Sequence, residues 1–194
     1  MFSVPPLMLS KEYEKIFHTK PKSFFDCGAA IGIIVRLALR CGMNARGIDI
    51  TKYPEQKLTI LDLCYGTQKS RCATIMDYKL QELFDKGRIE IKSILDCDTV
   101  RADIAYCNGI LTYFDEQTLP IVLSKFKNVK MLCAIHNTTE DILAAKQMGE
   151  TLETCNKPRN IQSNDWWLET FNKNGFNAKL NENLRTFIAI PYQK

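Results

Sequence analysis

The fold is decided by one stretch of the chain, Ser23–Ile50, which reads SFFDCGAAIGIIVRLALRCGMNARGIDI. Its apolar start predicts a β-strand that ends in a turn at Gly28. A helical pattern follows as far as Cys41, and the glycine after it is well placed to end a helix. A second strand is expected over residues 45–50, with Asp49 near its end. The stretch is therefore a strand, turn, helix and strand unit of an α/β protein.

The chemistry of this unit suits a nucleoside. A glycine at the end of a strand lets the backbone approach a ligand closely, because it has no Cβ. The helix behind the turn aims free N–H groups and a positive dipole end at an anionic group. Asp49 follows Gly28 by 21 positions, near the ~20 typical of an acidic residue that meets ribose hydroxyls. We therefore expect a nucleoside that carries a small anionic group.

The glycine pattern separates two classes of nucleoside-binding protein. The dinucleotide pattern G-x-G-x-x-G/A is matched at Gly28 but missed at Ala30 and Ile33. The pattern D/E-x-G-x-G-x-G is matched at Asp26, Gly28 and Gly32, and Ala30 replaces its central glycine. This stretch resembles motif I of the class I S-adenosylmethionine-dependent methyltransferases. The alternative is a tight structural turn in another kind of α/β protein.

The rest of the chain continues the alternation of strands and helices. Strands are predicted at 88–95, 102–107 and 129–135, with helical patterns between them. Near the end, WWLETFNKNGF precedes a predicted β-hairpin over 176–192. This ending resembles that of the same family, whose last strand inserts antiparallel to the others. The resemblance spans about Ser23 to Pro191. It implies a three-layer α/β/α Rossmann-like fold with a mostly parallel seven-stranded sheet and an antiparallel C-terminal strand.

The 194 residues are expected to form a single methyltransferase-like domain, 1–194. Residues 1–22 are a lead-in with a short helix that is predicted from Ser10 onward by the helical spacing of Tyr13, Ile16 and Phe17. This helix either covers the cofactor or packs on the sheet edge. Residues 51–71 are a probable insertion next to the substrate site, because the next convincing strand starts only near Arg88. This insertion either shapes substrate access or is decorative.

Composition limits the classes of function. The net charge of +4 permits an acidic partner without requiring one. Eight cysteines without a C-x-x-C pair, and only two histidines, indicate small core thiols in a reducing compartment and no metal site. The first residues make a poor signal peptide and no apolar segment is long enough to span a membrane, so a cytoplasmic protein is expected. No aromatic and basic stripe is evident, although nucleic acid is not excluded as a partner. The oligomeric state is not readable from the sequence.

The resemblance implies S-adenosylmethionine as the cofactor. The glycine turn is then expected under its methionine portion, Asp49 at its ribose and Asp96 at its adenine amine. The implied cofactor-binding residues are Asp26, Cys27, Gly28, Ala29, Gly32, Asp49, Ile50, Asp96, Cys97 and Asn108.

Three residues are candidates for a catalytic role. Asn108 follows the strand that resembles motif IV, although the N-P-P-Y signature of amino-directed nucleic-acid methyltransferases is absent. His136, at the end of a strand, is either a general base or a hydrogen-bonded structural residue. Tyr113 is expected as an aromatic wall of the site rather than as a proton carrier. Cys27 and Cys107 lie in apolar surroundings that favour inert thiols.

The predicted function is that of an enzyme that transfers a methyl group from S-adenosylmethionine to an unidentified acceptor, either a small molecule or a macromolecule. The first alternative is a catalytically inactive module of the same fold that binds the cofactor or assists a partner. The second is an NAD-dependent oxidoreductase, which the missing glycines disfavour.

Overall fold

The computed structural model describes residues 5–30, 32–50, 81–136, 138–147 and 160–192. The predicted insertion at 51–71 lies outside these residues. The strands are β1 (Ser23–Cys27), β2 (Asn44–Asp49), β3 (Ile89–Ile91), β4 (Ile104–Asn108), β5 (Met131–Ile135), β6 (Phe176–Asn181) and β7 (Thr186–Pro191). The helices are α1 (Pro6–Phe17), α2 (Ile33–Arg40), α4 (Gln81–Asp85), α5 (Leu119–Ser124), α6 (Thr139–Gln147) and α7 (Asn164–Lys173).

The seven strands among the described residues join one sheet in the order β3-β2-β1-β4-β5-β7-β6. Neighbouring strands from β3 to β5 run parallel, whereas β7 is antiparallel to both β5 and β6. The predicted α/β sheet with an antiparallel C-terminal strand is confirmed. The strand order reverses between β1 and β4, and open α/β sheets bind ligands at the carboxyl edge of such a point.

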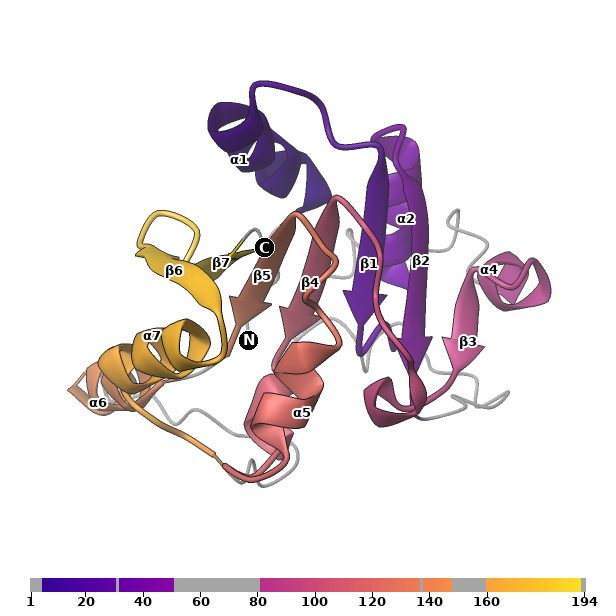
Figure 1. The fold of residues 1–194 in the computed structure, drawn as a ribbon. Helices are drawn as coiled ribbons and strands as arrows, with labels where there is room; N and C mark the ends of the chain where they lie inside the picture. The colour runs from indigo at the N-terminus through magenta and orange to yellow at the C-terminus, as the bar shows by residue number, and fades with distance from the viewer. Residues whose placement is uncertain (1–4, 31, 51–80, 137, 148–159, 193–194) are drawn as a thin grey trace.

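Two apolar cores fill the space on the two faces of the sheet. Alternation along β1 directs Phe24 to one face and Phe25 to the other. The first face packs against α1, α2 and α4, and the second against α5 and α7. Figure 1 shows α5 and α7 in front of the sheet and α2 behind it. This arrangement gives the three layers that the sequence predicts.

The lead-in helix begins earlier than its pattern suggests, because a proline suits the first turn of α1. Its Leu9 and Tyr13 are buried in the core beside α2. Of the two roles predicted for this helix, the structure shows packing against the sheet.

The strand predicted over 88–95 is shorter than expected. β3 ends at Ile91, and the chain turns into a single 3-10 turn at Ile94–Asp96. The Oγ of Ser93 accepts a hydrogen bond from the backbone N–H of Leu95, at 3.2 Å, and so starts that turn. The described residues include no helix that is long and apolar enough to cross a membrane.

Candidate functional site

A cavity of about 450 Å³ opens at the carboxyl ends of β1, β2 and β4, beside the point where the strand order reverses. This volume lies in the ~300–1,000 Å³ range of small-molecule sites. We call it the carboxyl-edge pocket. Its lining residues are Cys27, Gly28, Ala30, Ile48, Asp49, Ile50, Lys92, Ser93, Ile94, Asn108, Ile110, Tyr113 and Phe114.

The turn after β1 is tied to the end of β2 by backbone and side-chain hydrogen bonds. The N–H groups of Gly28 and Ala29 both donate to the carbonyl oxygen of Ile48, each at 2.9 Å. The N–H of Ala30 donates to Oδ2 of Asp49 at 2.8 Å. Gly28 has φ +83° and Ala30 φ +48°, a left-handed backbone that a non-glycine residue adopts only at a cost of about 1–2 kcal/mol. Asp49 therefore offsets the strain of the turn as well as facing the pocket.

Asp26 is enclosed behind the turn and is absent from the pocket lining. Burial, and next the negative charge of Asp49, raise the pKa of this carboxyl to about 8. Asp26 is therefore mostly protonated at neutral pH.

We predict that Asp26→Asn makes the protein more stable relative to wild type as the pH rises from about 4 to 8. The folded wild type holds a proton that an unfolded aspartate releases near pH 3.8, so ionisation favours the unfolded chain throughout this window. The difference between the two unfolding free energies is expected to grow by about 1.4 kcal/mol per pH unit. Urea denaturation at several pH values measures it. Parallel pH profiles would contradict the burial of an ionisable Asp26.

Two residues predicted to lie at the adenine, Asp96 and Cys97, are not among the described residues that line the pocket. The pocket is reached instead by Lys92, Ser93 and Ile94. Asp96 is exposed at the end of the 3-10 turn. The side chain of Cys97 packs against the core on the α5 and α7 side of the sheet.

Asn108 and Tyr113 both line the pocket, as the sequence predicts for site residues. The Oδ1 atom of Asn108 is buried and has no hydrogen-bond partner among the described residues. A buried acceptor of this kind costs about 1–3 kcal/mol unless a ligand or water supplies a donor. Ile110 and Phe114 complete an apolar wall beside Tyr113.

His136 lies in the core and not in the pocket. Its ring stacks on Phe187 with centroids 4.9 Å apart, and the ring of Trp167 is 3.9 Å away. Both ring nitrogens are buried without a hydrogen-bond partner in the described chain. Burial lowers the pKa of this imidazole to about 3, so it is neutral at physiological pH. Among the described residues, His136 is not part of the pocket lining and has no hydrogen-bond partner, so its catalytic or structural role stays a prediction.

We predict that His136→Leu weakens the dependence of stability on acid pH. The folded state binds a proton at His136 less readily than the unfolded chain, so wild-type stability falls as the pH drops from 6.5 towards 3. Relative to the variant, the loss is expected to be about 1.4 kcal/mol per pH unit. Urea unfolding at pH 7, 5 and 4 provides the comparison. An unchanged acid slope would show that this histidine is solvated.

Of the predicted cofactor residues, the structure brings together Cys27, Gly28, Asp49, Ile50 and Asn108. Ala29 and Gly32 support the turn from behind: Ala29 is buried, and the N–H of Gly32 donates to the Ala29 carbonyl at 2.8 Å. Sequence reasoning missed the lining residues Ala30, Ile48, Lys92, Ser93, Ile94, Ile110 and Phe114. For residues 92–94, the available signal in the sequence was Ser93, because a serine after a short strand often starts a turn.

No known protein-family profile matches the sequence, and no curated protein matches it. Solved structures do match its fold. The pyocyanin biosynthetic protein PhzM has a TM-score of 0.57 at 14% identity, with 93% of this chain and 53% of that chain covered. Magnesium protoporphyrin IX methyltransferase from Synechocystis PCC 6803, with bound S-adenosylhomocysteine, has a TM-score of 0.58 at 13% identity, with 96% and 82% covered.

A small RNA methyltransferase, HEN1, has a TM-score of 0.61 at 12% identity, with 97% of this chain and 25% of that chain covered. The chain thus spans about half of the first of these proteins and a quarter of the third. The sheet order, the antiparallel β7 and these likenesses agree. The protein has the three-layer fold of the class I S-adenosylmethionine-dependent methyltransferases.

Proposed function

We propose that the protein is a methyltransferase that uses S-adenosylmethionine and binds it in the carboxyl-edge pocket. One observation carries the proposal. The turn at Gly28 is held by Asp49, and both line a pocket at the point where the strand order reverses. A carboxylate beside a turn of this kind is suited to ribose hydroxyls, and the turn itself admits a close ligand.

The lining fits the chemical groups of this cofactor. Asp49 would hold the ribose, and Ser93 and Ile94 the adenine, in place of the predicted Asp96 and Cys97. The unpartnered oxygen of Asn108 suits an ammonium or N–H donor, which is a group that the cofactor's methionine portion carries. Asp26 remains a support of the turn rather than a contact, because it is buried behind it.

When bound, the cofactor supplies a methyl group on a positively charged sulfur, which is a good leaving group. The protein contributes mainly alignment, which is worth up to ~7–11 kcal/mol when two reactants are held together. Tyr113 and Phe114 would form an apolar wall that keeps water from the reacting atoms. The acceptor's own chemistry decides whether a base is needed. Tyr113 lines this pocket, whereas His136 does not.

Calorimetric titration with S-adenosylmethionine, S-adenosylhomocysteine and NAD tests the cofactor. We expect micromolar binding of both adenosyl compounds and none of NAD. Binding of NAD alone would overturn the proposal and favour an oxidoreductase. If none of the three compounds binds, only the assignment of the fold remains.

A cofactor-binding module without catalysis is the second candidate. One observation favours it: His136, the predicted general base, is enclosed between Trp167 and Phe187 outside the pocket. Both candidates predict cofactor binding, so the titration does not separate them. Formation of S-adenosylhomocysteine in the presence of candidate small-molecule and RNA acceptors does, because only an enzyme makes this product.

A further inference from the structure

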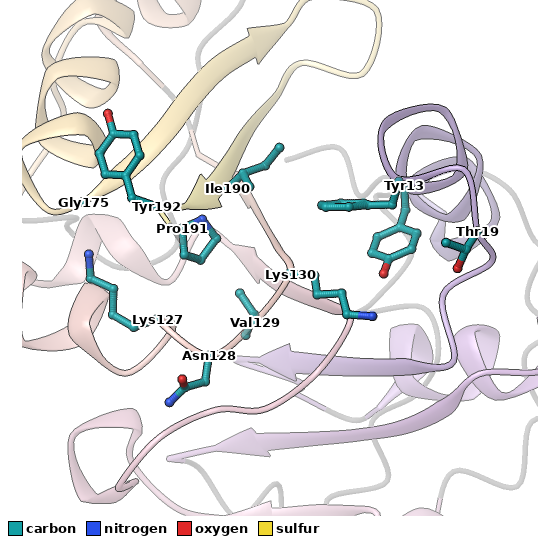
Figure 2. A pocket seen from close by; sticks show the side chains of 11 residues that line it. Tyr13, Thr19, Lys127, Asn128, Val129, Lys130, Gly175, Ile190, Pro191 and Tyr192 are labelled. Atoms are coloured by element: carbon teal, nitrogen blue, oxygen red, sulfur yellow. The ribbon is translucent and has the colours of Figure 1, made fainter. Parts of the chain in front are cut away.

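A second and larger cavity, of about 870 Å³, lies at the opposite edge of the sheet, near the amino end of β5 (Figure 2). We call it the amino-edge cavity. Its lining comes from the end of α1, the segment before β5, the turn before β6 and the end of β7. The residues are Tyr13, Phe17, Thr19, Lys127, Asn128, Val129, Lys130, Gly175, Ile190, Pro191 and Tyr192. The strands between the two edges have five or six residues, so they separate the amino edge of the sheet from its carboxyl edge by about 16–20 Å.

Aromatic side chains form the walls of this cavity. Tyr13 and Phe17 are neighbours on α1, with ring centroids 4.5 Å apart. Tyr13 is buried, Phe17 is partly exposed, and Tyr192 is 59% exposed. In Figure 2, Lys130 lies between Tyr13 on one side and Tyr192 on the other. The cavity therefore offers exposed ring surface at both of its sides.

Two lysines supply the charge of the lining, and none of its described residues carries a carboxylate. The Nζ of Lys130 is 2.9 Å from Oδ1 of Asp103, but its side chain remains 60% exposed. Lys127 is also exposed, and its ammonium lies over the ring of Phe176 and contacts the carbonyl of Asn174. Both cations thus stand at the rim of an apolar cavity, fixed by the contacts they make.

The positive charge extends beyond the cavity along the amino ends of β1, β4 and β5. β1, β4 and β5 are parallel, so the residues before them meet at one edge. Exposed Lys20 and Lys22 precede β1, and exposed Arg101 precedes β4. The carboxylates in these segments are Asp98 and Asp103, and Asp103 already accepts hydrogen bonds from the backbone of Lys22 and Ser23. The edge keeps an excess of cations.

We propose that the amino-edge cavity binds a segment of single-stranded nucleic acid. Proteins that bind single strands combine a cationic groove for the phosphates with aromatic rings on which bases stack. Tyr192 and Phe17 would stack on bases, and Lys127 and Lys130 would meet phosphates. This site is independent of methyl transfer, because it is separated from the carboxyl-edge pocket by the length of the strands.

An acidic polypeptide is the competing ligand, and the lining favours it less. Acidic-motif recognition typically uses arginine clusters, and the part of the lining that the structure describes contains no arginine. Addition of a peptide strand needs a free sheet edge, but β5 and β7 are each paired on both sides. A nucleic acid strand needs neither an arginine cluster nor a free sheet edge. Its bases stack on aromatic rings, and its phosphates pair with lysine ammonium groups.

Fluorescence anisotropy with a fluorescein-labelled oligouridylate of about 15 nucleotides tests the proposal, without cofactor and at several salt concentrations. We expect wild-type binding that weakens as salt rises. Tyr192→Ala should weaken it about tenfold, whereas Tyr192→Phe, which keeps the ring, should not. Lys127→Ala should make the slope of log K against log salt less steep by about 0.7, the value for one phosphate of a single strand.

Lys173→Ala is the matched control, because this exposed lysine on α7 lies outside the cavity lining. It should bind as wild type does. The proposal is overturned if wild type does not bind, or if Tyr192→Ala and Lys127→Ala bind as tightly as wild type. Tighter binding of a labelled polyglutamate than of the oligouridylate would overturn it in favour of an acidic polypeptide. None of these outcomes affects the titration with cofactor. Failure of the nucleic acid proposal can therefore be distinguished from failure of the proposed function.

Discussion

Replacing Asp49 by alanine is expected to lower the affinity for S-adenosylmethionine by about a hundredfold. The change removes the acceptor of the Ala30 N–H, at 2.8 Å, together with the carboxylate proposed to hold the ribose. A hundredfold change is about 2.8 kcal/mol, and a hydrogen bond to a charged group contributes about 1.5–3 kcal/mol, so loss of one ribose hydrogen bond accounts for an effect of this size. Isothermal titration calorimetry of wild type and variant measures it.

The variant Asp49→Asn separates the effect of the negative charge from that of the side chain's size and shape. Its amide oxygen still accepts a hydrogen bond from Ala30, so we expect an affinity between those of wild type and Asp49→Ala. Glu182→Ala, an exposed change in the β6–β7 turn, controls for the altered net charge and should bind normally. Thermal unfolding without ligand shows whether each variant is folded. A folded Asp49→Ala protein that binds within twofold of wild type would refute the ribose role.

Gly47→Ala is expected to lower the free energy of unfolding by about 2–3 kcal/mol, because it overpacks the contact between β2 and the turn. A Cβ built at this position would lie 2.6 Å from the Cβ of Ala29 and 2.9 Å from the carbonyl oxygen of Asp26. Both atoms belong to the backbone or sit directly on it, so relief requires the turn to move. For a chain of this length the melting temperature should fall by about 5–10 °C.

Gly42→Ala provides the comparison for this prediction. A Cβ there meets no atom within 4 Å, although the left-handed φ of +83° costs about 1 kcal/mol. Differential scanning calorimetry should therefore rank Gly47→Ala as clearly less stable than Gly42→Ala. Equal losses of stability in the two variants would mean that the turn moves away from the added Cβ without a cost in free energy. Weaker cofactor binding by a folded Gly47→Ala protein would also show that the same contact shapes the pocket.

The sequence was sufficient where structure depends on local spacing. The turn at Gly28 and the position of Asp49 follow from one run of residues, because each strand and helix there has its own periodicity. The hairpin at β6 and β7 was likewise readable, and its antiparallel insertion came with the family resemblance. The element bounds differ by a few residues, as at α1, where the proline of the first turn is not part of the apolar pattern.

The features that the sequence did not predict depend on contacts between segments that are distant in the chain. The alternation of residues 88–95 predicts one long strand, but burial of Ile94 and capping by Ser93 end it early and bring 92–94 to the pocket. His136 stands at a strand end, which suggests a site residue. Its ring is instead buried in the core, because Trp167 of α7 and Phe187 of β7 pack against it. The rings and lysines of the amino-edge cavity also come from segments that no sequence window contains together.

The place of β7 between β5 and β6 has a consequence for how the protein is made. Thr186 follows Ile135 by 51 positions, so the ribosome completes β5 about 3–10 seconds before β7 is available. During that interval the five residues of β5, all buried in the finished protein, present an unpaired apolar strand edge. The nascent chain is thus prone to aggregation until β7 is synthesised, and a chaperone that shields β5 would find its substrate in that interval.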